Sequence, residues 1–241
     1  MKAILCAVFA GAVLFAPPAA FAGDFADREL LGFSRDGAYF AFEEFGVLDG
    51  SAIPYSNVYV LAVDKDAWID GTPIRLKGAE EGADLDDLRV EAHSRVAPIL
   101  KKYGIAVAGR VAASNPFTEV TADPHKVRFF LDYGYLPAPA WDVTVTLTTT
   151  SEPVPCGNLG PVKGFRLVLT DSDGVAHVLH DDANALPSSR GCPRDYSIAD
   201  VITYFPKDGD ATMIVLLGVE SQGFEGPDRR YLAVASRFAT R

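Results

Sequence analysis

The sequence has little positive charge, and that charge is scattered. It contains 22 lysine and arginine residues against 32 aspartate and glutamate residues, which gives a formal net charge of −10. The longest basic runs are the pairs Lys101-Lys102 and Arg229-Arg230. Binding of nucleic acid or anionic lipid needs clustered basic side chains to neutralise phosphate groups. The composition therefore predicts no nucleic-acid partner.

Long apolar runs are missing beyond the first residues. The run at 3–16 follows a positively charged start, and it is succeeded by Pro17-Pro18 and the small-x-small motif Ala20-Phe21-Ala22. This layout is typical of a cleaved secretory signal peptide. The run is shorter than the roughly 20 apolar residues that span a bilayer, so an uncleaved anchor is the less favoured alternative.

The domain organisation follows from this interpretation. We expect a signal peptide at 1–22 and a single secreted domain at 23–241, with no transmembrane segment after cleavage. Export across the inner membrane would deliver the domain to the periplasm.

Cysteine is scarce as well. Of three cysteines, Cys6 lies in the predicted signal peptide, which leaves Cys156 and Cys192. An even pair in an exported chain predicts a disulfide bond, with two free buried thiols as the alternative. No cysteine or histidine stands at metal-ligand spacing from either residue, and this disfavours a metal site there.

Motifs that carry catalysis are also missing. The sequence has no G-x-S-x-G nucleophile elbow. Its segment 157–160, Gly-Asn-Leu-Gly, lacks the lysine and the following helix of a phosphate-binding loop. These absences favour a non-catalytic protein without a cofactor.

Most of the chain after residue 22 has the period-two alternation of β-strands. Examples are Val127–Tyr135, Trp141–Leu147, and a hairpin of Phe165–Asp171 with Val175–His180 around Ser172-Asp173-Gly174. We expect the proline pairs at 137–139 and 153–155 to lie in connections, because proline cannot donate to a strand ladder.

One amphipathic helix is predicted near 84–103. Leu85, Leu88, Ala92, Val96, Ile99 and Tyr103 recur at spacings of three and four, which places them on one helical face. Asp84 is a suitable N-cap and Gly104 a suitable C-terminal stop. Pro98 is expected to kink the helix or to end its regular part.

Two distant segments resemble each other. An offset of 172 positions aligns six identical residues without a gap: Phe33, Asp36, Gly37, Gly46, Val47 and Tyr59 with Phe205, Asp208, Gly209, Gly218, Val219 and Tyr231. Each segment has an Asp-Gly turn, a strand, a loop and a return strand, so we predict matching N-terminal and C-terminal β-hairpins. The return strands are Val58–Val63 and Arg230–Ala235.

Glu43 and Glu44 end the first strand of the N-terminal hairpin. Adjacent strand residues point to opposite faces, so these carboxylates cannot act together on one substrate without a bulge. We interpret the pair as the charged end of a strand meeting solvent.

These patterns predict a mainly β fold of antiparallel sheets with one amphipathic helix near 84–103. The sheets would form a sandwich-like structure or a partial, irregular β-propeller. The offset of 172 residues would accommodate four propeller blades, but the helix and the absence of intermediate Asp-Gly turns disfavour a full propeller.

The segments 32–66, GFSRDGAYFAFEEFGVLDGSAIPYSNVYVLAVDKD, and 218–234, GVESQGFEGPDRRYLAV, resemble a bacterial family of predicted secreted proteins of unknown function. The resemblance covers nearly all of the mature chain and implies export in Gram-negative bacteria. It implies no activity, and no functional residue carries over. Residues 33–64 also resemble single β-propeller blades locally.

The two long hairpin loops, 46–57 and 218–229, are the predicted binding region, because loops on a rigid sheet concentrate binding residues. The candidates are Asp49, Tyr55, Glu220, Phe224, Glu225, Asp228, Arg229 and Arg230. Packed surface loops with local ion pairs are the alternative. The leading function is a non-catalytic periplasmic binding or envelope-interaction module, whose partner is an envelope protein or a small ligand.

The rival interpretation is an envelope hydrolase or metal-dependent enzyme that uses His177, His180 and Asp181. Residues three apart on a strand face opposite ways, so both histidines reach one ion only if the strand has ended. The pattern therefore favours a structural role for these residues and no metal site.

Overall fold

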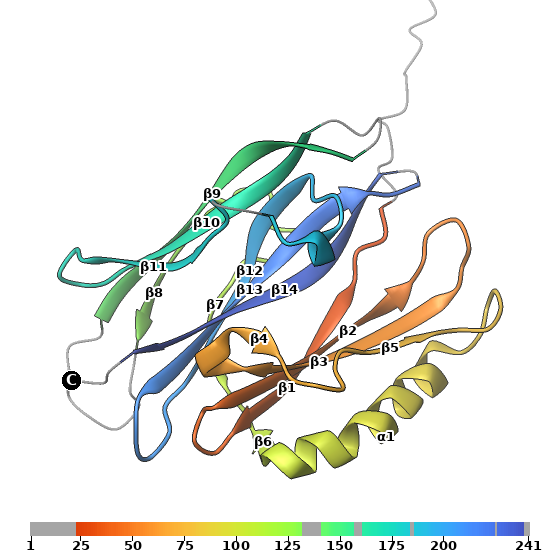
Figure 1. Cartoon of the computed structure of the whole chain (residues 1–241), viewed down its shortest axis with the longest axis horizontal. Coiled ribbons are helices and arrows are strands. Elements are labelled where there is room, and N and C mark those ends of the chain that lie inside the picture. Colours follow the sequence, from red (N-terminus) through yellow and green to blue (C-terminus); the bar gives the residue numbers. More distant parts are fainter. Residues whose placement is uncertain (1–22, 132–140, 157–160, 184–185, 225, 239–241) are drawn as a thin grey trace, which may run out of the picture.

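The computed structural model describes residues 23–131, 141–156, 161–183, 186–224 and 226–238. The predicted signal peptide at 1–22 lies outside these residues. Within them the chain forms three antiparallel sheets and one α-helix (Figure 1). This confirms the predicted mainly β fold. None of the helices in the described part has the length and hydrophobicity needed to cross a membrane.

The N-terminal sheet has the strand order β4-β3-β2-β1-β6, and β5 also pairs with β3. A 3₁₀ turn, η1, connects β3 to β4. The elements are β1 Asp27–Ser34, β2 Tyr39–Val47, β3 Pro54–Ala62, η1 Val63–Lys65, β4 Ala67–Trp68, β5 Ile74–Lys77 and β6 Ile105–Val107.

The central sheet has the order β14-β13-β12-β7 and the outer sheet the order β11-β10-β9-β8. A second 3₁₀ turn, η3 at Ser188–Arg190, lies between β11 and β12. The strands are β7 Arg110–Ser114, β8 Lys126–Leu131, β9 Trp141–Pro155, β10 Pro161–Thr170, β11 Ala176–Asp181, β12 Asp195–Tyr204, β13 Ala211–Gln222 and β14 Pro227–Phe238. The prediction of a connection at 153–155 was wrong, because β9 continues through Pro155, with a register shift beside it.

The sheets stack as layers, with the central sheet in the middle (Figure 1). One face of the central sheet packs on the outer sheet through residues such as Tyr196, Met213 and Phe165. The opposite face packs on the N-terminal sheet through Ile214 and Phe42, among others. β13 is therefore buried on both faces, which explains its continuous apolar run, MIVLL, at 213–217.

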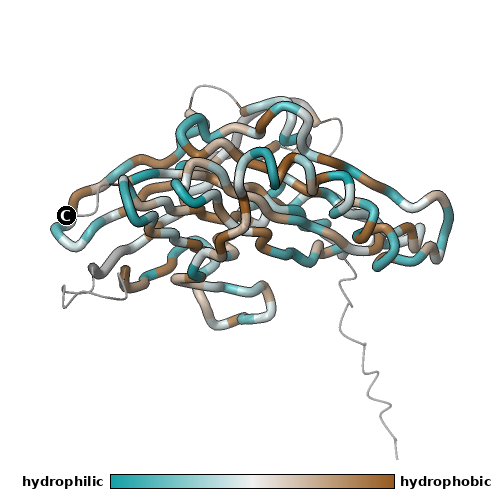
Figure 2. Tube along the Cα trace, turned by 90° about the horizontal axis from the view of Figure 1, so that it is seen from below, coloured by the Kyte–Doolittle hydropathy of each residue, from teal (hydrophilic) through white to brown (hydrophobic). Residues whose placement is uncertain are grey.

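The helix α1, Leu85–Tyr103, covers the other face of the N-terminal sheet. The side chain of Asp84 caps it by accepting hydrogen bonds from two backbone amides, and Gly104 ends it in the left-handed conformation at φ 64°. Both predicted ends are confirmed. The helix continues through Pro98 to Tyr103. Figure 2, seen from the side on which α1 lies, shows hydrophilic and hydrophobic residues alternating along the trace.

The interpretation of Glu43 and Glu44 as solvent-exposed was wrong. Both carboxylates are buried, with 0% and 1% of their surface exposed, because both faces of the N-terminal sheet are covered. They do point to opposite faces, as strand alternation requires. Glu43 faces α1, where it accepts hydrogen bonds from Arg89 at 2.9 Å and from His93 at 2.8 Å.

The two similar hairpins lie face to face in neighbouring sheets. Tyr59 and Tyr231 both occupy return strands, β3 and β14. The Asp-Gly turn of the first hairpin contacts the second hairpin, since Thr212 at the start of β13 donates a hydrogen bond to the carbonyl of Gly37 at 3.0 Å. The strand registers differ, however. Phe42 pairs with Tyr59, whereas Ile214 pairs with Ala235 rather than with Tyr231. An ancestral repeat therefore stays a prediction.

The predicted disulfide between Cys156 and Cys192 is present, with an S–S distance of 2.05 Å. It ties the end of β9 to the segment that follows η3. Because η3 lies outside the regular sheets, this covalent link fixes its position over the edge of the central sheet.

We expect Arg89→Ala to lower the free energy of unfolding by about 3 kcal/mol, because it leaves the buried carboxylate of Glu43 without its main counter-charge. Arg95→Ala, which breaks an exposed i,i+4 pair with Glu91 on the same helix, should cost less than about 0.5 kcal/mol. Urea unfolding at pH 7 measures both values. Equal losses in the two variants would contradict a special role for Glu43.

The same network predicts an acid-dependent loss of stability. Burial raises the pKa of Glu43, but the hydrogen bonds from Arg89, His93 and Ser56 outweigh it and lower the pKa below the ordinary value of 4.5. The network therefore stabilises the fold above that pH, and the contribution is lost as the pH falls through the depressed pKa. Urea unfolding between pH 6 and pH 3 should show a shallower decline in Arg89→Ala than in the wild type.

Removal of the disulfide should destabilise the domain by up to about 4 kcal/mol, the chain-entropy value for a loop of 36 residues. Thermal unfolding of a Cys156→Ser/Cys192→Ser double variant measures this loss. A reducing agent should lower the melting temperature of the wild type toward that of the double variant. A wild type whose thiols titrate freely without reductant would refute the bond.

Candidate functional site

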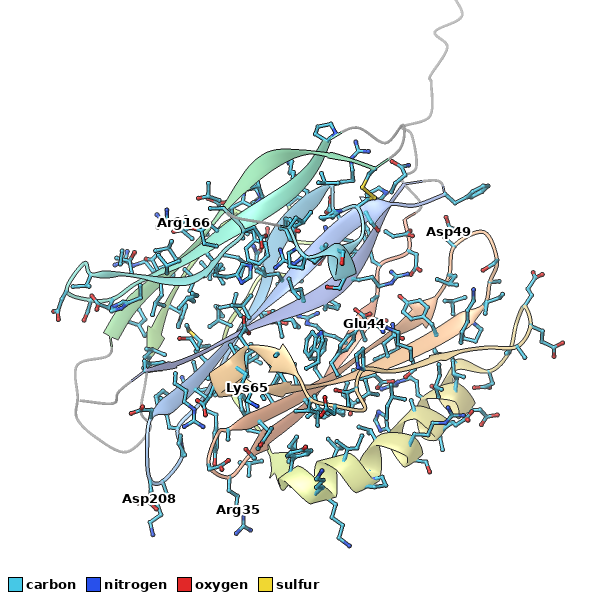
Figure 3. The ribbon with its side chains drawn as sticks, in the orientation of Figure 1. Arg35, Glu44, Asp49, Lys65, Arg166 and Asp208 are labelled. Atoms are coloured by element: carbon cyan, nitrogen blue, oxygen red, sulfur yellow. A yellow bond between two sulfur atoms is a disulfide. The ribbon has the colours of Figure 1, made fainter. Side chains whose placement is uncertain are left out.

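A cleft of about 770 Å³ opens between the N-terminal and central sheets. Strands β3, β4 and β5 form one wall and β14 forms the other, while η3 and His180 of β11 lie over it. Figure 3 shows Glu44 between the two sheets. The lining residues that carry polar or aromatic groups are Glu44, Asn57, Tyr59, Asp66, Trp68, Arg75, His180, Ser189, Arg190, Arg230 and Tyr231.

Glu44 connects the two walls of the cleft. One carboxylate oxygen accepts hydrogen bonds from the Tyr59 hydroxyl at 2.7 Å and from the Asn57 amide at 3.0 Å. The other oxygen accepts the backbone N–H of Tyr231 at 2.7 Å. Glu44 thus pairs with groups on β3 of its own sheet and on β14 of the facing sheet. These three donors compensate the cost of burying an ionised carboxylate.

The outer edge of β14 is occupied by protein groups. The outward N–H groups of Arg229, Tyr231 and Ala235 are bound by the Asp24 carbonyl, by Glu44 and by Asp66, at 2.9, 2.7 and 2.8 Å. Two of these acceptors are side-chain carboxylates, which cannot continue a strand ladder. This edge is therefore closed to the addition of an extended peptide, the usual hazard of an exposed edge strand.

Aromatic rings form the apolar part of the cleft. The Tyr59 ring stacks on that of Phe42, with centroids 4.9 Å apart, and contacts the Trp68 ring at 5.0 Å. Burial raises the pKa of Tyr59, and the neighbouring charge of Glu44 raises it further. The hydroxyl therefore stays protonated and donates to Glu44 across the physiological pH range.

Arg190 of η3 is held over the cleft by three contacts. Its guanidinium pairs with the buried Asp182, lies 4.6 Å above the Phe165 ring, and lies 2.9 Å from the His180 ring nitrogen. Burial raises the pKa of Asp182, but hydrogen bonds from His180, the Phe165 amide and Arg190 outweigh it and lower that pKa. The disulfide at Cys192, two residues further on, secures this segment.

The far end of the cleft is closed by Arg230. Its guanidinium pairs with the buried carboxylate of Asp24 and lies 4.5 Å above the Tyr55 ring. The Tyr55 hydroxyl donates to the same carboxylate at 3.2 Å. Of the seven predicted binding residues that the structure describes, Arg230 is the one that lines the cleft.

The other predicted loop residues lie at the hairpin tips or in local pairs. Glu220 pairs with Arg229, and Asp228 accepts the backbone N–H of Asp24 at 3.2 Å. The Phe224 side chain is 79% exposed and lies against Gly50 of the other hairpin. Asp49 lies in that neighbouring tip (Figure 3), and Glu225 falls outside the described residues. The structure brings the two tips together but does not test whether they bind anything.

His177, His180 and Asp181 do not converge on one point. His177 pairs with Asp171 at 3.0 Å, His180 pairs with Asp182 at 2.8 Å, and Asp181 lies 3.5 Å from Arg166. In the described part of the chain, the one set of three potential metal ligands with atoms within 4.8 Å of each other is Glu29, Glu43 and His93. Arg89 already pairs with both of those glutamates, so a cation would have to displace it.

Sequence reasoning missed most of the cleft. Glu44, Trp68, Arg75 and Arg190 come from four separate segments, and none belongs to a spaced motif. The one sequence pattern that could have indicated this lining is the alternation along β3, which places Asn57, Tyr59 and Leu61 on one face. In the sheet, Asn57 of β3 pairs with Glu44 of β2 on one side and with Arg75 of β5 on the other. These three neighbours make the cleft-facing side of the sheet polar around Asn57.

These features define a class: a layered, mainly β protein with a disulfide and a polar and aromatic cleft between two of its sheets. The chain belongs to the family described as Predicted secreted protein (DUF2259), whose model matches residues 41–237. The matched residues include every residue that lines the cleft, nearly the whole C-terminal hairpin, and the N-terminal hairpin from Ala41 onward. No curated protein and no solved structure matches the chain.

We expect Glu44→Ala to lower the free energy of unfolding by about 3 kcal/mol, because it leaves the Tyr231 N–H and the Tyr59 hydroxyl without an acceptor. Asp66→Asn is the matched control, since the amide oxygen can still accept from Ala235. It should cost less than about 1 kcal/mol. Guanidinium unfolding measures both. A Glu44→Ala variant as stable as the control would show that Glu44 does not join the walls.

Proposed function

We propose that the protein is a non-catalytic periplasmic binding module and that the cleft between the N-terminal and central sheets receives a small ligand. The observation that carries this proposal is the cleft itself. A volume of about 770 Å³ lies within the roughly 300–1,000 Å³ range of ligand pockets. Aromatic rings with a few fixed polar groups are the usual lining of such pockets.

The state of the ionisable groups supports binding rather than catalysis. A general acid or base needs a proton that it can exchange with substrate. In the cleft, Glu44 is held by three donors, Arg190 by Asp182 and Arg230 by Asp24. Ser189 and His180 both line the cleft, but His180 directs its ring nitrogen at Asp182 and Arg190. Such groups position a ligand without reacting with it.

Export is supported by the family, and the periplasm is our proposal for the final compartment. The disulfide between Cys156 and Cys192 fits an oxidising space. Cleavage of the predicted signal peptide at 1–22 would leave Gly23 as the first residue. Asp24 would then lie next to the new N-terminus, where it supports Arg230 at the end of the cleft.

The tips of the two hairpins are a second candidate region, favoured by the exposure of Phe224 and its contact with Gly50. An envelope protein that bound there would contact Phe224 first. A test of the cleft should therefore include this residue, so that the two locations are distinguished.

The test is a thermal-shift screen of the mature protein against small metabolites of different chemical classes. A compound that binds the native state raises the melting temperature, and the rise grows with the logarithm of the ligand concentration above its dissociation constant. We expect at least one class to do so, and Trp68→Ala to abolish the shift. Phe130→Ala, which removes a 60% exposed ring on the outer sheet, is the aromatic control and should leave the shift unchanged.

Phe224→Ala should likewise retain the ligand-induced shift. If Phe224→Ala lost it while Trp68→Ala kept it, the binding site would lie at the hairpin tips. If no class of compound shifted the wild type, and none copurified with it in native mass spectrometry, a ligand-binding cleft would be rejected.

A further inference from the structure

We propose that the ligand of the cleft is an uncharged ring with several hydroxyl groups, a small saccharide. This inference rests on the proposed function, since it concerns the same cleft, and it specifies the ligand's chemistry. Three features carry it: the balance of charge, the hydrogen-bonding groups that keep capacity for a ligand, and the arrangement of the aromatic rings.

The charges in the cleft are largely neutralised by the protein. Arg190 pairs with Asp182, and Arg230 pairs with Asp24. Both of these carboxylates lie behind the lining, which therefore gains little net charge. Glu44 has three donors of its own. Because these groups are already paired, they would give a charged ligand little compensation, and burying an uncompensated charge is costly in a site partly removed from water.

The groups that remain open include both donors and acceptors. Arg75 is exposed at the mouth of the cleft, where one of its donors reaches the Tyr59 hydroxyl. It forms no ion pair with any described residue, so its remaining donors stay available. Asp66 uses one oxygen to accept from Ala235 and keeps the other available. The two side chains line the cleft without pairing with each other.

The backbone of Ala233 adds a further donor and acceptor. In an antiparallel pair, alternate residues direct both N–H and C=O away from the partner strand. Arg229, Tyr231 and Ala235 do so on β14, and each N–H has a protein acceptor. Ala233 has the same orientation and lines the cleft, but its N–H finds no acceptor among the described residues. Buried backbone groups rarely remain unpaired, so a bound molecule is the natural partner.

A hydroxyl group satisfies such a mixed set, because it donates one hydrogen bond and accepts others. A carboxylate would serve Arg75 and Ala233 but would be repelled by Asp66. An ammonium group would serve Asp66 and the Ala233 carbonyl but would be repelled by Arg75. An extended peptide matches the backbone of Ala233, but Glu44 and Asp66 occupy the neighbouring amides and leave a gap only one residue wide.

The aromatic rings indicate that the hydroxyls are carried on a ring. Tyr59, Trp68 and Tyr231 line the cleft together, and the Tyr59 and Trp68 rings contact each other at 5.0 Å. The faces of aromatic rings carry partial negative charge. They attract the weakly positive C–H groups on the flat side of a sugar ring, while hydroxyls around its rim reach Arg75, Asp66 and Ala233.

The experiment measures the affinity of the mature protein for matched sugars by isothermal titration calorimetry and tryptophan fluorescence. The neutral probes are glucose, galactose, N-acetylglucosamine, maltose and cellobiose. Glucuronate and glucosamine supply the negative and positive counterparts, and benzoate supplies an aromatic anion. We expect at least one neutral sugar to bind and its charged counterparts to bind at least tenfold more weakly.

Substitutions of residues that line the cleft test whether the sugar binds there. Arg75→Gln and Asp66→Asn should each raise the dissociation constant about three- to tenfold, the effect of one hydrogen bond. Trp68→Ala should raise it about tenfold or more, and Trp68→Phe should retain part of the affinity. Arg166→Gln, which alters a half-exposed arginine on the outer sheet, should have no effect.

The outcomes separate this inference from the proposed function. Tighter binding of benzoate or glucuronate than of neutral sugars, abolished by Trp68→Ala, would overturn the saccharide assignment and leave the binding cleft intact. Sugar binding that is insensitive to Arg75→Gln, Asp66→Asn and Trp68→Ala would also overturn it. Failure of every probe, together with a negative metabolite screen, would reject both.

Discussion

Two adjacent buried carboxylates on β2 determine how the layers of this protein are joined. Strand geometry directs neighbouring side chains to opposite faces, so Glu43 and Glu44 must be satisfied by different layers. Glu43 is bound by Arg89 and His93 of α1, and Glu44 by the backbone of β14 in the central sheet. An ionised carboxylate without such partners would cost several kcal/mol to bury. The pair therefore fixes both the helix and the facing sheet relative to one strand.

The cleft results from the attachment of Glu44 to β14. At the other end of the same interface, Phe33, Phe40 and Phe42 pack directly against the central sheet and exclude water. At the Glu44 end, the contact is made by polar groups, which hold the sheets together without filling the space beside them. Along β2 and β3, the interface between the two sheets thus changes from an apolar core to a polar, aromatic cleft. We expect a ligand to bind at the cleft end of this interface.

The sequence predicts some features well because their causes are local. The helix from Asp84 to Gly104 follows from caps and spacing, and the disulfide follows from a single even pair of cysteines. The burial of Glu43 and Glu44 could not be predicted, because it depends on both faces of the sheet being covered. Arg190, which lies over the cleft, comes from a segment more than a hundred residues from Trp68. No local pattern specifies that juxtaposition.

Hydrogen exchange measured by mass spectrometry tests the division of roles between the two carboxylates most directly, with Glu43→Gln and Glu44→Gln compared in the same buffer. We expect Glu43→Gln to accelerate exchange in α1 and to leave β14 protected, whereas Glu44→Gln should accelerate exchange in β14, above all at Tyr231, and leave α1 protected. Faster exchange in both elements for both variants, or in neither, would contradict this division of roles.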